Sequence, residues 1–265
     1  MRKGNLLLQK EYLGPFRTPA LLSYTPDGRK KPLVILAPGG GNQDIDNRKE
    51  LLSQTLPLEG EDFFKVYVDL PLHGERLAPD LGKRFWSDQV RLFLHPTVLG
   101  MARELVALID TLSEKEDADT SRVGVCGWSL GGQASLLAAA ADGRIRAAIG
   151  LSIPYDAWQG PVAPGPDSPA HFVMRTEMDL ISAAHNMCPT AVLLIHGAKD
   201  AWVTVDSSRH LYAALKPHYV SCQERLRYIE YPNMAHFISK AEDEACAEEQ
   251  RQLKEEVAAW FRKFL

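Results

Sequence analysis

The sequence predicts an α/β fold with a mostly parallel, doubly wound sheet and helices on both of its faces. Apolar runs of strand length alternate along the chain with longer segments whose apolar residues recur at helical spacing. A glycine-rich turn at residues 127–132 also separates one such strand from a run of strong helix formers. With 265 residues, 45% of them hydrophobic and 24% charged, the chain suits one large domain, which we expect to span 1–265.

The elements follow from the same patterns in chain order. We expect strands at 33–37, 63–69, 122–126, 145–151, 191–195 and 226–231. Helices are expected from residue 47, near 97–112, at 133–141 and at the C-terminus, where Ser239 and Glu242 form a capping-box pattern. Pro96 is expected to separate the 97–112 helix from a helical piece around 84–94. The first thirty residues should add a short antiparallel ribbon that turns at 26–28.

One stretch interrupts the alternation and is predicted to form a short cap-like insertion. Residues 152–189 are rich in proline and then carry a segment, 174–184, that we expect to be helical. In a doubly wound sheet such an excursion lies above the carboxyl ends of the strands, where ligands bind. Half of the six methionines fall within it, which suits an adaptable apolar wall over a substrate, although they could equally pack the segment onto the sheet. Trp158 and Met178 are the residues here that we expect to contact substrate.

Composition and charge exclude several classes of function. A formal net charge of −4 without any Lys/Arg run gives no reason to expect nucleic acid or an anionic membrane as a partner. The four cysteines are widely spaced and form no metal-ligand pattern. Reduced thiols, the lack of a signal-type apolar region and the lack of a membrane-length run together predict a cytoplasmic protein.

The turn Gly127-Trp128-Ser129-Leu130-Gly131-Gly132 carries the chemistry. A G-x-S-x-G sequence between a buried strand and a helix is the pattern of a nucleophile elbow. The turn is so tight that the positions two before and two after the serine cannot hold a bulky side chain. Ser129 is therefore predicted to be the nucleophile, exposed in a strained conformation at a helix N-terminus.

A serine hydroxyl needs a base, and the base needs a carboxylate to orient it. In elbow-type enzymes the acid and then the histidine follow the serine, each on a loop after a later strand. Asp200 directly follows the strand expected at 191–195, and His236 lies just beyond the strand expected at 226–231. Taken singly, Asp200 could be a turn or capping residue and His236 a surface loop histidine. Their order after Ser129 favours a catalytic triad.

The oxyanion hole needs two backbone N–H groups aimed at the developing negative charge. One is expected from Leu130, which follows the nucleophile. The other is expected from the glycine-rich loop after the 33–37 strand, where Gly40 is the predicted donor and Gly41 the neighbouring alternative, itself predicted to contact substrate. The same loop lacks the patterns of phosphate-binding and dinucleotide-binding loops.

These motifs together resemble the α/β-hydrolases, nearest to the small serine esterases of the dienelactone hydrolase and prolyl-oligopeptidase-like branch. Residues 69–76 resemble the D-x-P-x-H-G-x-R segment of those proteins, and residues 196–203 resemble their H-G-x-x-D-x-x-V acid loop. The resemblance implies the α/β-hydrolase fold, and packing or loop-pinning roles for His73 and His196. Two positions depart from relatives: Pro38 stands where many have a histidine, and Ser129 replaces the cysteine of dienelactone hydrolases proper.

The expected activity is hydrolysis of a carboxylic ester through an acyl-enzyme, without a metal or cofactor. Trp202, in the acid loop, is a further residue expected to contact the small-molecule acyl substrate. Peptide or amide cleavage, thioester hydrolysis and acyl transfer remain alternatives that use the same machinery, and a homo-oligomer is compatible with the sequence. A non-catalytic binding module on this scaffold is the alternative from another class.

Overall fold

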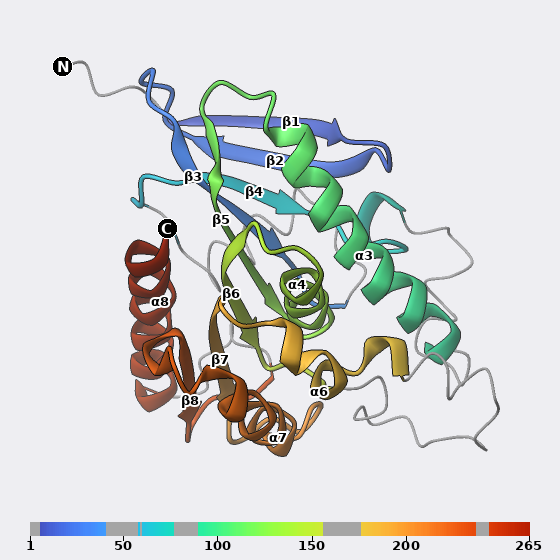
Figure 1. Cartoon of the computed structure of the whole chain (residues 1–265), viewed down its shortest axis with the longest axis vertical. Coiled ribbons are helices and arrows are strands. Elements are labelled where there is room, and N and C mark those ends of the chain that lie inside the picture. Colours follow the sequence, from blue (N-terminus) through green and yellow to red (C-terminus); the bar gives the residue numbers. More distant parts are fainter. Residues whose placement is uncertain (1–5, 41–57, 59, 77–89, 156–175, 237–243) are drawn as a thin grey trace.

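A computed structural model describes residues 6–40, 58, 60–76, 90–155, 176–236 and 244–265, with the backbone alone at 90–95. Eight strands form one sheet in the order β1-β2-β4-β3-β5-β6-β7-β8 (Figure 1). The strands are β1 (Leu7–Leu13), β2 (Thr18–Tyr24), β3 (Lys31–Ala37), β4 (Phe64–Val68), β5 (Ala118–Trp128), β6 (Ile145–Leu151), β7 (Ala191–Gly197) and β8 (Leu226–Tyr231). The six strands from β3 onward pair in parallel, while β1 with β2 and β2 with β4 pair antiparallel.

Helices cover both faces of this sheet, as the sequence predicts. They are α3 (Val90–Leu112), α4 (Leu130–Ala141), α6 (Leu180–Ala183), α7 (Asp206–Leu215) and α8 (Glu244–Phe264), with 3-10 turns η1 (Gly74–Arg76), η2 (Ala184–Asn186), η3 (Lys216–Tyr219) and η4 (Gln223–Arg225). One core cluster joins the sheet to α3, α4, α6 and α7, and a second joins its other face to α8. Figure 1 shows α8 on one side of the strands, with α3 and α4 on the other.

The central strands are short apolar runs because both of their faces are covered. All seven residues of β7 are buried, as are all five of β4. The expected strands at 145–151 and 226–231 match β6 and β8, and those at 33–37, 63–69, 122–126 and 191–195 correspond to β3, β4, β5 and β7 within a few residues. The carboxyl ends of β3, β5, β7 and β8 therefore lie along one edge of the sheet.

The expected break at Pro96 is wrong, because α3 runs through this proline without interruption. A proline inside a helix removes one hydrogen bond and crowds the preceding turn. Pro96 is exposed, whereas Val98, Met101 and Leu105 beyond it are completely buried against the sheet. The packing of this long apolar face outweighs the one bond that is lost.

Two other boundaries also differ from the prediction. The N-terminal ribbon turns at residues 14–17 between β1 and β2, and β2 then pairs with β4, so 26–28 is only the connection to β3. The helix expected over 174–184 is interrupted at Asp179, whose side chain accepts a hydrogen bond from Ile181 N and starts α6. The expected helix from residue 47, the helical piece around 84–94 up to residue 89 and the capping box at Ser239 lie outside the described residues.

Candidate active site

Ser129 stands in the sharp turn between β5 and α4 that the sequence predicts. Its backbone dihedral angles are φ 53° and ψ −121°, a region that residues with a side chain seldom occupy. The backbone N–H of Ser129 donates to the carbonyl of Leu151 at 2.8 Å, so the adjacent strand β6 holds the turn. A strained serine at the first turn of a helix is the geometry of a nucleophile elbow. Ser129 is only 9% exposed, however, so the predicted exposure of this serine is wrong.

The flanking glycines are required by space. A Cβ on Gly127 would lie 2.3 Å from the carbonyl carbon of Gly131, and one on Gly131 would lie 2.2 Å from the carbonyl oxygen of Pro38. Real Cβ atoms do not approach backbone so closely. The prediction that positions two before and two after the serine must be small is therefore confirmed.

Asp200 lies in the loop that follows β7, where its carboxylate is almost completely enclosed. Oδ1 accepts hydrogen bonds from the backbone N–H groups of Trp202 and Val203, both at 2.8 Å. Oδ2 lies 2.7 Å from Nδ1 of His236 and 3.2 Å from Nε2 of His196. Burial alone would raise the pKa of this carboxyl, but the hydrogen bonds from His196 and His236, the charge of His236 and the Val203 N–H hold that pKa well below its ordinary value.

His236 lies in the loop after β8 and is 6% exposed. Two backbone hydrogen bonds tie its loop to the acid loop: Ala198 N donates to Tyr231 O at 2.8 Å, and Lys199 N donates to Met234 O at 3.0 Å. From the other side the buried carboxylate of Glu249, on α8, accepts from both the backbone and the side-chain nitrogen of Asn233. The loop is therefore held on two sides, by the acid loop and by α8.

The ring of His236 also lies beside the residue that precedes the serine. The ring centroids of Trp128 and His236 are 5.4 Å apart, and those of Trp202 and His236 are 6.3 Å apart. Trp128 and the contact between His196 and Asp200 are features of the site that the sequence analysis missed. Trp128 occupies the variable position before the serine, and only the fold shows that its ring reaches the histidine.

The predicted oxyanion loop packs on the elbow. Gly40 follows β3 and is partly buried, and a Cβ on its neighbour Gly39 would lie 3.0 Å from the ring of Trp128. Leu130 is the first residue of α4, where backbone N–H groups have no partner within the helix. Gly41 lies outside the described residues.

The residues predicted to contact substrate differ in their exposure and in their neighbours. Trp202 is 39% exposed next to His236. Met178 is 1% exposed within the core cluster on the α4 side, and its carbonyl accepts from Gln133 Nε2 at 3.0 Å. Trp158 lies outside the described residues, as does most of the predicted cap-like insertion. The substrate contacts of these residues and the role of the insertion stay predictions.

His73 and His196 contact the loops that they are expected to pin. His73 is buried, with Nδ1 2.9 Å from the carbonyl of Pro71. Arg76, in the same segment, donates to Asp69 O and pairs with the buried carboxylate of Glu104 on α3. These contacts join the segment after β4 to the neighbouring helix.

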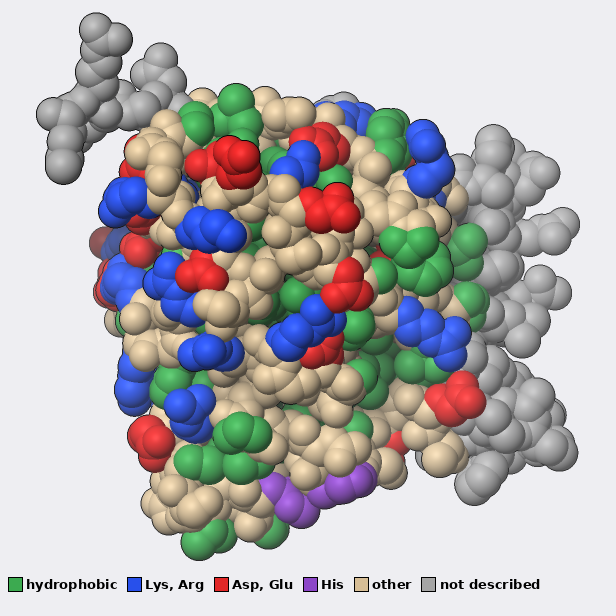
Figure 2. Space-filling model, turned by 45° about the horizontal axis from the view of Figure 1, so that its top comes forward, with side chains coloured by type: hydrophobic (Ala, Val, Ile, Leu, Met, Phe, Trp, Pro, Cys, Tyr) green, Lys and Arg blue, Asp and Glu red, His purple; other side chains and the backbone are tan. Residues whose placement is uncertain are grey.

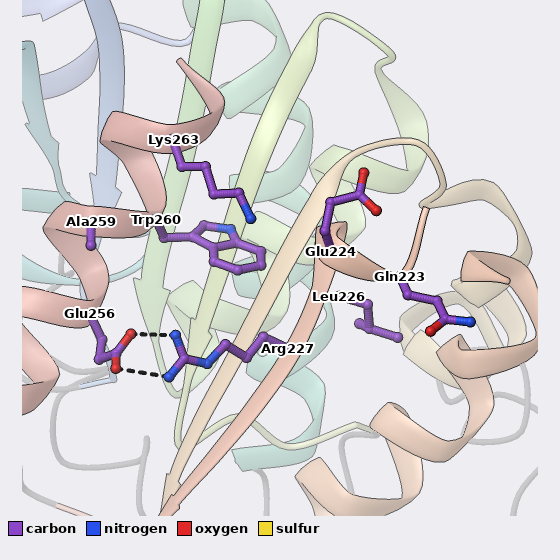
Figure 3. A pocket seen from close by; sticks show the side chains of 8 residues that line it. All are labelled: Gln223, Glu224, Leu226, Arg227, Glu256, Ala259, Trp260 and Lys263. Atoms are coloured by element: carbon purple, nitrogen blue, oxygen red, sulfur yellow. Dashed lines mark hydrogen bonds and ion pairs between the residues drawn. The ribbon is translucent and has the colours of Figure 1, made fainter. Parts of the chain in front are cut away.

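The pocket shown in Figure 3 lies elsewhere on the molecule. It has a volume of about 360 Å³ between η4, β8 and α8, lined by Gln223, Glu224, Leu226, Arg227, Glu256, Ala259, Trp260 and Lys263. Arg227 and Glu256 form an ion pair across it at 2.6 Å. Leu226 starts β8, whereas His236 follows the end of that strand, so the pocket lies at the opposite edge of the sheet.

Away from Ser129, Asp200 and His236, the part of the chain that the structure describes shows mixed surface charge and no cluster of metal ligands. Figure 2 shows basic and acidic side chains intermixed on the face that it presents. Across the described ranges, no three His, Cys, Asp or Glu side chains are grouped to hold a metal ion. None of the helices in those ranges combines the length and the apolar character needed to cross a bilayer. Cys126 is completely buried, which raises the pKa of its thiol far above the usual range.

The comparison with known proteins agrees with this geometry. The sequence profile of the Prolyl oligopeptidase family matches residues 100–265, more than half of the chain. The chain belongs to the prolyl oligopeptidase family. The matched segment of this family member contains Ser129, Asp200 and His236, whereas Gly40 precedes it. The chain is a serine hydrolase, as expected from the elbow.

Individual relatives support the same fold. The chain is 28% identical over 232 residues to "Putative esterase YitV" of Bacillus subtilis (strain 168), covering 80% of this chain and 86% of that protein. TT1662 from Thermus thermophilus aligns with a TM-score of 0.74 at 17% identity, covering 96% of this chain and 98% of that chain. Acylaminoacyl peptidase of Pyrococcus horikoshii aligns with a TM-score of 0.73 at 16% identity, covering 100% of this chain and 42% of that chain. The predicted α/β-hydrolase fold is confirmed.

Proposed function

We propose that this serine hydrolase cleaves carboxylic esters through an acyl-enzyme on a Ser129–His236–Asp200 triad. The observation that carries the proposal is the 2.7 Å contact between His236 Nδ1 and Asp200 Oδ2, beside the strained elbow of Ser129, where the preceding Trp128 has its ring centroid 5.4 Å from that of His236. The carboxylate can only accept, so Nδ1 of His236 bears the proton. Nε2 of the neutral ring then has the lone pair that a general base needs.

The reaction follows from these roles. His236 removes the proton of Ser129 as its oxygen attacks the ester carbonyl, and the imidazolium that forms is stabilised by Asp200. The backbone N–H groups of Leu130 and Gly40 hold the oxyanion. Protonated His236 then donates its proton to the departing alcohol, and a water molecule hydrolyses the acyl-enzyme by the same route.

The preference for an ester over an amide rests on the relatives. The Bacillus protein carries the name of an esterase and matches along most of its length. The acylaminoacyl peptidase matches over only 42% of its own chain, so most of that peptidase has no counterpart here. Its likeness and the family name still support peptide or amide cleavage as the second candidate.

Turnover of one acyl group presented in three linkages tests the proposal. The p-nitrophenyl ester, a thioester and an amide of the same short-chain acid should be compared for wild type, Ser129→Ala and the control Ser113→Ala, whose exposed hydroxyl donates to Asp110 O. We expect ester turnover to be highest, Ser113→Ala to match wild type, and Ser129→Ala to lose several orders of magnitude. Full ester turnover by Ser129→Ala would refute the nucleophile, and faster amide cleavage would refute the ester preference.

A further inference from the structure

Beyond the three triad residues, a second buried histidine contacts the acid. His196 is the penultimate residue of β7, is completely buried and points toward the side of the sheet that α7 covers. Its Nε2 lies 3.0 Å from Val203 O and 3.2 Å from Asp200 Oδ2, and its Nδ1 lies 2.7 Å from Ser208 Oγ on α7. Both ring nitrogens of His196 therefore have polar partners within hydrogen-bonding distance.

The partners determine where the ring proton lies. The Val203 carbonyl can only accept a hydrogen bond, and so can the Asp200 carboxylate, so Nε2 must carry a proton. Ser208 has a hydroxyl that can donate to an unprotonated Nδ1. The neutral ring with its proton on Nε2 thus satisfies all three contacts, and its N–H points between the carbonyl and the carboxylate.

The same carboxylate oxygen serves both histidines. Oδ2 of Asp200 receives His236 Nδ1 at 2.7 Å and His196 Nε2 at 3.2 Å, while Oδ1 is held by backbone N–H groups. We propose, building on the triad of the proposed function, that His196 is a positioning residue whose Nε2–H fixes this oxygen and takes up part of its negative charge. Asp200 then holds His236 in one orientation and stabilises its charged form less strongly than a carboxylate without that donor would.

The other charged groups around His196 are already paired. On β8, Glu230 lies opposite it in register, and the Glu230 carboxylate accepts from Arg209 of α7 and from Tyr228 Oη. Along β6 the register neighbour of Ile195 is Leu151, which carries no charge. Among the described residues, Asp200 is therefore the acid to which the Nε2–H of His196 is directed.

Two amide substitutions, which keep different ring nitrogens' contacts, separate positioning from simple packing. His196→Gln can place an N–H donor near the Nε2 position and so keep the contact with Asp200, whereas His196→Asn places its amide near Nδ1 and keeps only the contact with Ser208. A third variant, Ser208→Ala, removes the other contact of the ring and leaves the one with Asp200. The dependence of kcat/KM on pH with a p-nitrophenyl ester, and kcat and KM separately, should be measured for all three.

We expect His196→Asn to lose about tenfold to hundredfold in kcat with little change in KM, the range for one lost hydrogen bond to a buried charged group. In this variant, the acidic limb of the plot of kcat/KM against pH should move to higher pH by about one unit, because Asp200 then stabilises the His236 imidazolium more strongly. His196→Gln and Ser208→Ala should keep the wild-type limb. Equal losses of kcat in His196→Asn and His196→Gln would overturn the proposal and leave a packing role. So would an acidic limb in His196→Asn that stays at its wild-type pH or moves to lower pH.

An NMR titration of the His236 ring separates this inference from the proposed function. The titration needs no turnover, so it reports on the Asp200–His236 pair even if no ester is cleaved. A higher His236 pKa in His196→Asn than in wild type would support the inference in either case. An unchanged value would overturn it while leaving the assignment of Ser129 as nucleophile intact.

Discussion

Replacing Asp200 by asparagine changes a single oxygen of the carboxylate into an NH₂ group, and the surroundings determine which one. Two backbone N–H groups, from Trp202 and Val203, point at Oδ1 and cannot accept a hydrogen bond. The amide oxygen must therefore take the place of Oδ1, which puts the NH₂ group at the position of Oδ2. There it faces Nδ1 of His236 and Nε2 of His196.

This orientation predicts a large loss of activity. The NH₂ group can only donate, so His236 must present an unprotonated Nδ1 and carry its proton on Nε2. Nε2 then faces the serine as a donor and cannot act as the base. The same change of tautomer lowers kcat by about 10⁴-fold in another serine hydrolase, and we expect a similar loss here.

The stability should fall as well. The N–H of His196 would lose one acceptor and meet a second donor in a completely buried place. Leaving a buried polar group unsatisfied costs about 1–3 kcal/mol. The free energy of unfolding should drop by that amount.

The assay compares kcat/KM for a p-nitrophenyl ester and urea unfolding in Asp200→Asn and in Asp206→Asn. Asp206 undergoes the same chemical change at the exposed start of α7, where it pairs only weakly with Arg209. The control should stay close to wild type in both measurements. Activity within tenfold of wild type in Asp200→Asn would refute the assignment of Asp200 as the triad acid.

Three further outcomes follow from the same contacts. Gly131→Ala should lose about 1–3 kcal/mol or more of unfolding free energy, because its Cβ would lie 2.2 Å from Pro38 O. The control Gly143→Ala, whose Cβ would have no atom within 4 Å, should keep the wild-type value. Chemical denaturation measures the unfolding free energy of both variants. Trp202→Ala should lower kcat/KM for aryl esters several-fold more than for alkyl esters of the same acid, because its exposed ring lies beside His236, where an aromatic leaving group can stack on it. An unchanged ratio of the two kcat/KM values contradicts this role. The folded-state pKa of Asp200 is depressed, so this group stabilises the fold above about pH 4 and that contribution is lost as the pH falls toward the folded value. Urea unfolding from pH 7 down to about pH 2 should therefore show a steeper loss for wild type than for Asp200→Asn.

The parts of the site that depend on local rules could be predicted from the sequence. The glycines around Ser129 are needed at fixed positions by the tight turn, so the pattern specifies the backbone. Asp200 could be placed because a parallel strand must deliver its following loop to the carboxyl edge of the sheet. The boundaries of β6 and β8 followed from short runs of mostly apolar and aromatic residues, interrupted by one charged side chain in β6 and by two in β8.

The parts of the structure that depend on contacts between distant segments could not be predicted from the sequence. Nothing near Pro96 in the sequence shows that the buried face beyond it would hold the helix continuous. The pairing of β2 with β4 is set by the order of strands in the sheet and not by the turn that follows β2. His196 and Ser208 lie twelve positions apart, and their contact depends on how α7 packs against β7.

The position of the histidine shows how the fold completes the site. Ser129 follows β5, whereas Asp200 follows β7, and β6 lies between these strands, which separates their ends by about 10 Å. The loop after β8 must therefore cross back over the end of β7 to bring an imidazole between them. Gly197 allows this crossing, because a Cβ there would lie 2.1 Å from Met234 O. The crossing ends where Trp128 and Trp202 lie close to the ring of His236 and where Asp200 holds its Nδ1. A glycine at the end of β7 is thus as necessary to the site as those beside the serine, and for the same reason: backbone must pass where a side chain would otherwise stand.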